Sequence, residues 1–491
     1  MHDVKPVTTG PNAIVRGSVW TGLRQAVQQA CALISLVVVA RLIPPAEVGL
    51  FSMATLVLTI TRALTETGFE QALIHRAELD DEVLDAGFVA VLARGLLVGL
   101  VLALAANLFA AFFEEPRVAD ILRALALGIA IEGLINNRVA MFQRSLDFRR
   151  YFFFHTAGQL VGLFATVASA FVLHNVWAVV AGQLASALAR VIASYVLCRE
   201  RPRLRFRWAL ARDLLKYGRW VSASSVLLFL LVNGDNVVIG KWIGAEALAY
   251  YNWAYQLASL PALVITQVLS SVMFPALAAV RGDQKRLAEL YARSMRLTWL
   301  LALPGSLLIA ALVELFTRAL LGEKWLPIVP LTHALVVFGL LRAIGASAGA
   351  LFLAIGKPDV RAKLQIAQLL VFAASLYPLF QGYGVLGVAL SVTAYSVLNL
   401  PAAQYGLHLV GLGPGALLRP ILITIIAAVS GAGGALLCAR ALGRIGAPLL
   451  LQLIVAGLSG LLVIALLLMW LDPKGELAQS LRALRRLRSP S

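Results

Sequence analysis

Long, uninterrupted apolar segments recur along the whole chain and limit the folds open to it. The segment 96–113 is one example, and runs of about 18 or more residues follow one another through the sequence. A helix of about 20 apolar residues crosses the hydrocarbon core of a bilayer. A transmembrane β-barrel would instead show shorter segments in which apolar and polar residues alternate. The chain is therefore predicted to be an all-α integral membrane protein.

The composition supports this class and weighs against a soluble one. Hydrophobic residues make up 60% of the chain and charged residues 14%, whereas soluble domains have about 45–50% and about 25%. The net charge of +17 would suggest nucleic acid in a soluble protein. Here most basic residues fall in short loops, as the positive-inside rule requires, so no nucleic-acid partner is expected.

We predict about fourteen transmembrane helices. They are residues 17–40, 48–73, 84–113, 118–140, 151–173, 176–198, 214–240, 247–280, 295–317, 326–355, 362–380, 385–410, 416–439 and 447–471. The most basic loops follow the fourth, sixth, eighth and tenth helices, and the tail is also basic. All of these lie on one side of the membrane if both termini are cytoplasmic.

A repeat at an offset of 200 residues divides the chain. Residues 40–54 resemble residues 240–254: each begins where a helix ends next to a basic residue, continues through a tight turn and opens a new helix. This pattern predicts two six-helix bundles related as parallel repeats, with two further helices at the C-terminus. The predicted segments are an N-terminus 1–16, a bundle 17–198, a basic linker 199–213, a bundle 214–410, two additional helices 416–471 and an amphipathic basic tail 472–491.

Polar and charged residues inside the spans are the candidate functional residues, because a charge in the bilayer is costly unless it faces water or a partner. Arg24 and Gln28 share a helical face, as do Arg62 and Glu66. The candidates for an anion-binding cavity are Arg24, Gln28, Arg62, Glu66, Arg94, Asn136 and Arg342. The alternative is that they form ion pairs within the bundle or reach toward the membrane surface.

Two carboxylates are candidates for ion or proton coupling, Asp235 and Glu132. Asp235 could equally be the counter-ion of an arginine on another helix. The six histidines and three cysteines show no metal-ligand or disulfide spacing, and no glycine-rich phosphate loop is present. The sequence thus predicts a transporter rather than an enzyme, without a metal or cofactor.

A family resemblance is carried by residues 233–244 (NGDNVVIGKWIG), 249–254 (AYYNWA), 272–277 (VMFPAL) and 143–150 (QRSLDFRR). These segments resemble the polysaccharide transporter branch, with its colanic-acid-exporter-like members, of the multidrug/oligosaccharidyl-lipid/polysaccharide exporter superfamily. The resemblance covers about residues 15–410. The positions of Arg24 and Arg62 resemble those of cavity arginines in the first two helices of the related lipid II flippases, but the neighbour of Arg24 is Gln25 and not an Asp.

The resemblance implies a flippase of the bacterial inner membrane with a V-shaped central cavity. Its substrate would be an undecaprenyl-diphosphate-linked oligosaccharide for exopolysaccharide, capsule or O-antigen (lipopolysaccharide) synthesis. Membrane lipids, a polysaccharide polymerase and a chain-length regulator are the candidate partners. The alternatives are a cation-coupled multidrug antiporter of the same superfamily and a membrane glycan polymerase or ligase.

Overall fold

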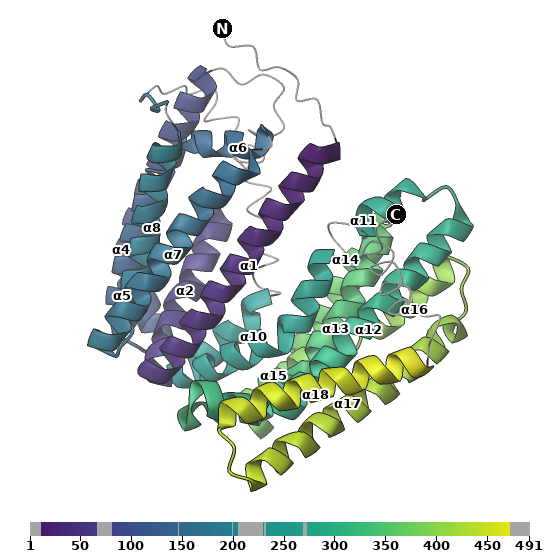
Figure 1. Ribbon diagram of the computed structural model, residues 1–491. Helices are drawn as coiled ribbons and strands as arrows, with labels where there is room; N and C mark the ends of the chain where they lie inside the picture. Colours follow the sequence, from purple (N-terminus) through teal and green to yellow (C-terminus); the bar gives the residue numbers. More distant parts are fainter. Residues whose placement is uncertain are drawn as a thin grey trace, which may run out of the picture. The chain divides into compact units, whose positions relative to one another are not determined.

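The computed structural model describes residues 11–65, 81–145, 147–198, 200–204, 229, 232–268 and 273–471. Within these ranges all regular structure is helical (Figure 1). Glu66, most of the predicted linker and of the helix 214–240, and the predicted tail lie outside the described residues. The described helices belong to two compact units, which divide between Ala249 and Tyr250. The bundle boundary at 199–213 stays a prediction.

The first unit contains six long helices and several short ones. Its helices are α1 (Pro11–Leu42), α2 (Pro45–Thr65), α4 (Asp81–Phe113), α5 (Arg117–Glu132), the 3-10 turn η1 (Asn137–Val139), α6 (Ala140–Arg144), α7 (Phe148–Leu173) and α8 (Trp177–Leu197). A further helix covers residues 232–242, and α10 (Ala245–Val268) begins in this unit. In the sequence colours of Figure 1 these elements run from purple to teal.

The second unit is built around α13, which has the most buried face. Its elements after α10 are α11 (Phe274–Ala279), α12 (Gln284–Phe316), the π turn η3 (Thr317–Leu321), η4 (Glu323–Trp325), α13 (Ile328–Ala354), α14 (Pro358–Tyr383), α15 (Val385–Ser396), α16 (Asn399–Leu409), η5 (Pro414–Leu417), α17 (Leu418–Arg444) and α18 (Leu449–Leu471). Tyr291, Phe352 and Trp325 are fully buried in this unit. The helices α17 and α18 pack together and against α12, with Gly431 and Gly460 at their contact.

Eleven helices in the described ranges are long and apolar enough to span a membrane, and each corresponds to one of the predicted spans. The prediction of an all-α, multi-pass membrane protein is confirmed. The total of fourteen spans and the repeat of the two halves stay predictions. One predicted span, 118–140, is interrupted, because α5 ends at Glu132 and Asn136 adopts an extended conformation that starts η1.

The two turns that the repeat matched have the same backbone pattern. In the first, Ile43 N–H donates to Val39 and Val48 N–H to Pro44; at an offset of 200, Ile243 donates to Ile239 and Leu248 to Gly244. The turns also meet, because a Cβ on Gly49 would collide with the backbone of Ala245. A glycine is therefore required where α2 passes the start of α10.

Small residues bring the helices of the first unit close together. A Cβ on Gly162 would lie 2.9 Å from Cβ of Ser186, so α7 and α8 are almost in backbone contact there. Gly95 of α4 faces Gly133 in the same way, with 2.9 Å from its added Cβ to the other glycine's Cα. In a membrane, where lipid is as apolar as leucine, such close packing is a principal source of helix association.

Candidate functional site

A polar pocket of about 730 Å³ lies inside the first unit. It is bordered by the last turn of α2, the first half of α4, the end of α5, the start of α7 and the second half of α8. Phe229, Val232 and Asn233 also contribute to its wall. Since α5 ends here and α7 begins here, the pocket lies toward one end of the bundle.

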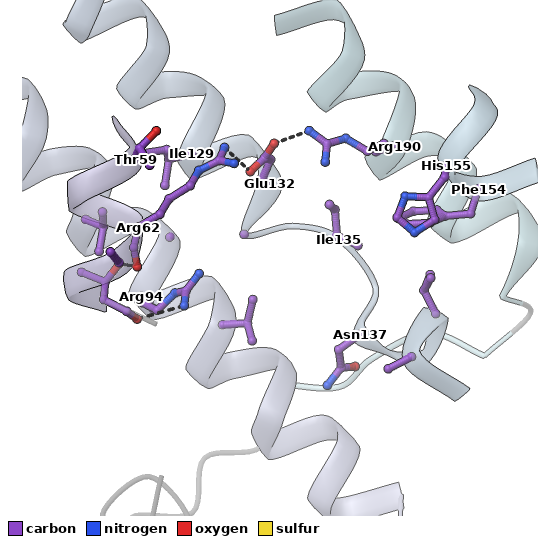
Figure 2. Close-up of a pocket in the computed structure, with 18 of the residues that line it drawn as sticks. Thr59, Arg62, Arg94, Ile129, Glu132, Ile135, Asn137, Phe154, His155 and Arg190 are labelled. Carbon is purple, nitrogen blue, oxygen red and sulfur yellow. Dashed lines mark hydrogen bonds and ion pairs between the residues drawn. The ribbon is translucent and has the colours of Figure 1, made fainter. Parts of the chain in front are cut away.

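Glu132 joins two arginines across this pocket (Figure 2). Its Oε2 lies 3.0 Å from Nη2 of Arg62, and its Oε1 accepts a hydrogen bond from Nη2 of Arg190. The three residues come from α5, α2 and α8. Glu132 is the last residue of α5, where the helix dipole disfavours a negative charge, so the two guanidinium groups provide the compensation.

The two arginines differ in their exposure to solvent. The side chain of Arg62 is 58% exposed and that of Arg190 28% exposed. The side chain of Arg190 packs against α7 at Gly158, where a Cβ added to the glycine would lie 2.5 Å from Cγ of Arg190. Its Nε is buried and makes no hydrogen bond among the described residues. Arg190 is thus held in place by packing, whereas Arg62 is only tethered by its carboxylate partner.

Arg94 supplies a third guanidinium group, from α4. Its Nη1 donates to the backbone carbonyl of Thr65, the last residue of α2, at 3.0 Å. Figure 2 shows Arg94 and Arg62 on the same side of the pocket, facing Glu132 and Arg190.

Aromatic side chains of α7 form another part of the wall. Tyr151, Phe154 and His155 all line the pocket, and the rings of Tyr151 and His155 meet edge to face with centroids 4.4 Å apart. The guanidinium of Arg24 lies 5.7 Å from the centroid of Tyr151. Arg24 therefore supports this wall from α1 and is not itself a lining residue.

A polar corner after α5 completes the pocket. The side chain of Asn136 accepts from Arg138 N–H at 3.1 Å and donates to the carbonyl of Glu200 at 2.9 Å. Asn137 donates to the carbonyl of Leu84 at 2.7 Å. These amides fix the irregular backbone after Glu132, so they position the pocket wall.

The predicted candidates divide into four groups. Those that line the pocket are Arg62, Arg94, Glu132 and Asn136. Arg24, Gln28 and Asp235 are not among its lining residues. Asp235 is buried and accepts hydrogen bonds from Asn236. Arg342 belongs to the second unit, where it donates to the hydroxyl of Tyr255 at 3.1 Å. Glu66 lies outside the described residues.

Arg190 is the residue that the sequence analysis did not select. It stands in the apolar segment 177–197, and the cost of a charge in a span, which identified the other arginines, applies to it equally. His155, Asn137 and Gln143 also line the pocket and were not chosen.

The charge of the pocket favours an anion. Its described lining residues include three arginines and one glutamate, which gives 3 − 1 = +2 with His155 neutral. Each guanidinium can donate two parallel hydrogen bonds to a carboxylate or phosphate. No group of three metal-ligating side chains occurs among the described residues.

A second charged cluster lies near the same end of the unit. Arg138 pairs with Asp85 at 3.6 Å and with Glu200. Asp85 also accepts a hydrogen bond from Arg203 N–H at 3.0 Å. The side chains of Arg138 and Asp85 are only 11% and 4% exposed, so these two residues are nearly closed to solvent, whereas Glu200 is 72% exposed.

Two polysaccharide biosynthesis proteins of bacteria are similar to this chain in sequence. The lipopolysaccharide biosynthesis protein WzxC of Escherichia coli (strain K12) is 24% identical over 78% of this chain and 79% of its own length. The succinoglycan biosynthesis transport protein ExoT of Rhizobium meliloti (strain 1021) is 24% identical over 68% of this chain and 66% of its own. The prediction of a transporter and not an enzyme is confirmed by these relatives.

Solved structures identify the fold. The lipid II flippase MurJ in an inward closed conformation matches 93% of this chain and 98% of its own with a TM-score of 0.71 and 14% identity. An inward-facing multidrug resistance MATE family transporter matches 78% of this chain and 94% of its own with a TM-score of 0.63 and 18% identity. At these identities the likeness concerns the fold alone.

The family model described as polysaccharide biosynthesis protein matches residues 38–330. This match includes α2 to α8 and therefore every helix that contributes an arginine to the pocket. The fold of this chain is that of MurJ and the inward-facing MATE transporter, and the chain belongs to the polysaccharide biosynthesis protein family.

Proposed function

We propose that this protein is a flippase that moves undecaprenyl-diphosphate-linked oligosaccharides from the inner to the outer leaflet of the bacterial inner membrane. The product would serve exopolysaccharide, capsule or O-antigen synthesis. The observation that carries this proposal is the pocket in which Arg62, Arg94 and Arg190 gather within a membrane-spanning bundle. WzxC and ExoT, whose names place them in lipopolysaccharide and succinoglycan synthesis, support the substrate class.

The chemistry of the pocket fits the diphosphate of such a lipid. A diphosphate offers several anionic oxygens in two tetrahedra, and planar guanidinium groups bind these oxygens in pairs. Tyr151 and Gln143 provide an aromatic face and an amide for sugar hydroxyls. A volume of about 730 Å³ lies within the usual 300–1,000 Å³ of ligand pockets, so it accommodates the diphosphate and its nearest sugars.

The cost of charge in a membrane supports a wet or anion-filled pocket. An arginine in the middle of a span costs about 2.5–3.5 kcal/mol on insertion scales. Water or an anion in the pocket would lower this cost for its arginines. The exposed side chain of Arg62 agrees with a water-filled pocket.

The multidrug antiporter is not favoured as an alternative. The MATE transporter shares the fold, so the fold does not separate the two functions. The charge of the pocket does, because a cationic drug would be repelled by an excess of two positive charges.

The basic loops support the proposed orientation in the membrane. Arg144 is the last residue of α6, and Arg149 and Arg150 lie in the first turn of α7, next to the end of the bundle that holds the pocket. Under the positive-inside rule this end faces the cytoplasm. We therefore propose cytoplasmic termini, substrate entry from the inner leaflet, and alternating access. A polysaccharide polymerase and a chain-length regulator are the proposed partners.

The test is polymer export in cells that depend on this transporter. Arg62→Gln and Arg94→Gln, each expressed at the wild-type level, should reduce export. Arg123→Gln is the matched control, because Arg123 pairs with Asp120 on α5 and is not a lining residue. Full export with the combined Arg62→Gln/Arg94→Gln variant would refute the assignment of the pocket.

A further inference from the structure

The pocket contains its own anion, and this is a feature that a binding site for a diphosphate does not require. Glu132 uses one carboxylate oxygen for Arg62 and the other for Arg190. These contacts occupy donors that a phosphate would use. Any anion entering the pocket must compete with this carboxylate.

We propose that Glu132 is an exchangeable counter-ion, which the substrate's diphosphate displaces from Arg62 while Arg190 keeps its bond to the carboxylate. This inference rests on the proposed function and assigns Glu132 the control of affinity and release. It differs from ion coupling, in which the carboxylate would bind a cation or proton.

The two arginines that pair with Glu132 differ in solvent exposure, as this exchange requires. Arg62 is the more exposed partner, and its bond at 3.0 Å is open to solvent. Exposed ion pairs contribute little and are readily exchanged. Arg62 also lies on the same side of the pocket as Arg94 (Figure 2), so an anion that takes Arg62 can contact Arg94 at the same time.

Arg190 is not expected to separate from Glu132 during this exchange. Its stem is packed against Gly158, and its side chain is less than a third exposed. Separation from Glu132 would leave a half-buried carboxylate, 22% exposed, without a partner near the C-terminus of α5, where the helix dipole is also unfavourable. The Arg190–Glu132 pair therefore stays together and holds the carboxylate ready to recapture Arg62.

The exchange has a quantitative consequence. Apparent affinity falls by the fraction of molecules in which the binding group is available. If Arg62 is paired with Glu132 in about nine of ten empty pockets, removal of the carboxylate raises anion affinity about tenfold. The same removal slows release, because nothing then replaces the departing diphosphate. A tighter binder should thus be a slower transporter.

The experiment is a binding titration of the purified full-length protein with farnesyl diphosphate. The variants are Glu132→Gln, Arg62→Gln and the double variant. Asp120→Asn is the matched control, because it removes a carboxylate from the same helix outside the pocket. We expect about tenfold tighter binding for Glu132→Gln, unchanged binding for Asp120→Asn, and no gain from Glu132→Gln when Arg62 is already Gln.

Three outcomes would overturn the proposal. Weaker or unchanged binding by a well-folded Glu132→Gln variant would show that the carboxylate only builds the pocket. An equal gain in the Arg62→Gln background would show a general charge effect and no exchange at Arg62. If Glu132→Gln fails to fold, Glu132→Asp, which is too short to bridge both arginines, must still bind more tightly than wild type or the exchange is wrong.

The same titration also distinguishes a failure of the exchange from a failure of the proposed function. In that case farnesyl diphosphate would not bind to wild type or to any variant. Binding that depends on Arg62 but not on Glu132 would contradict the exchange alone.

Discussion

Two charged clusters in the first unit have opposite compositions. One places a carboxylate, Glu132, between two arginines; the other places an arginine, Arg138, between two carboxylates. The first lines the pocket and includes an arginine that is 58% exposed. In the second, both Arg138 and Asp85 are nearly closed to solvent.

The difference shows how the same ionic chemistry serves two purposes. In the closed cluster, the backbone N–H of Arg203 adds a hydrogen bond to Asp85, so the group fastens the segment after α8 to the start of α4. In the open cluster, excess positive charge and solvent access leave capacity for a ligand. Burial, rather than the number of charges, separates a structural cluster from a binding site.

The largest effect is expected where the closed cluster is broken. Asp85→Ala removes a buried carboxylate that pairs with the buried side chain of Arg138, which should lower the free energy of unfolding by about 3 kcal/mol. Thermal unfolding of the purified protein measures this, with Asp120→Asn as the control for an exposed carboxylate. Equal stability of wild type and Asp85→Ala would remove the distinction between the two clusters.

The open cluster should lose binding and keep its stability. Arg62→Gln removes a charged donor and should weaken farnesyl diphosphate binding about tenfold, since hydrogen bonds to charged groups contribute about 1.5–3 kcal/mol. The unfolding temperature should change little because the side chain is exposed. A variant that bound normally but unfolded early would reverse the roles that we assign to the clusters.

Gly158 tests how firmly the open cluster is positioned. Gly158→Ala places a methyl group 2.5 Å from Cγ of Arg190 and should shift this guanidinium away from Glu132. We expect about a threefold change in diphosphate binding, less than that for Arg62→Gln because the arginine is moved and not removed. Gly22→Ala, which has nothing within 4 Å of its added Cβ, is the matched control and should bind as wild type does.

The smallest effect is expected for an ion pair that belongs to neither cluster. Lys241 donates to Glu114 at 2.6 Å, and this hydrogen bond lowers the pKa of the Glu114 carboxyl below its ordinary 4.5. The pair should therefore contribute at every pH above that value and be lost as the pH falls through the lowered pKa. Thermal unfolding of wild type and Glu114→Gln from pH 7 to pH 3 should show a small difference that disappears at the acid end. A difference that grew toward low pH would contradict this sign.

The sequence predicted the fold class and most spans because a bilayer leaves few alternatives for long apolar segments. It also selected Arg62, Arg94 and Glu132, since a charged side chain in a span is costly unless it faces water or a partner. What it lacked was the pairing: Arg190 and Glu132 are 58 positions apart, and their contact depends on the room that Gly158 leaves. Arg24 was selected by the same cost, and its guanidinium lies 5.7 Å from the ring of Tyr151 without lining this pocket, because helix packing as well as charge decides which face meets the pocket.

The central claim is tested most directly by translocation in vesicles. Purified protein would be reconstituted into liposomes with undecaprenyl-diphosphate-linked oligosaccharide, and the sugar exposed on each leaflet would be followed by enzymatic digestion from outside. We predict rapid exchange between leaflets with wild-type protein and with Arg123→Gln, and strongly reduced exchange with Arg62→Gln/Arg94→Gln. Exchange at the rate of protein-free vesicles for wild type, or at the wild-type rate for the double variant, would contradict the account.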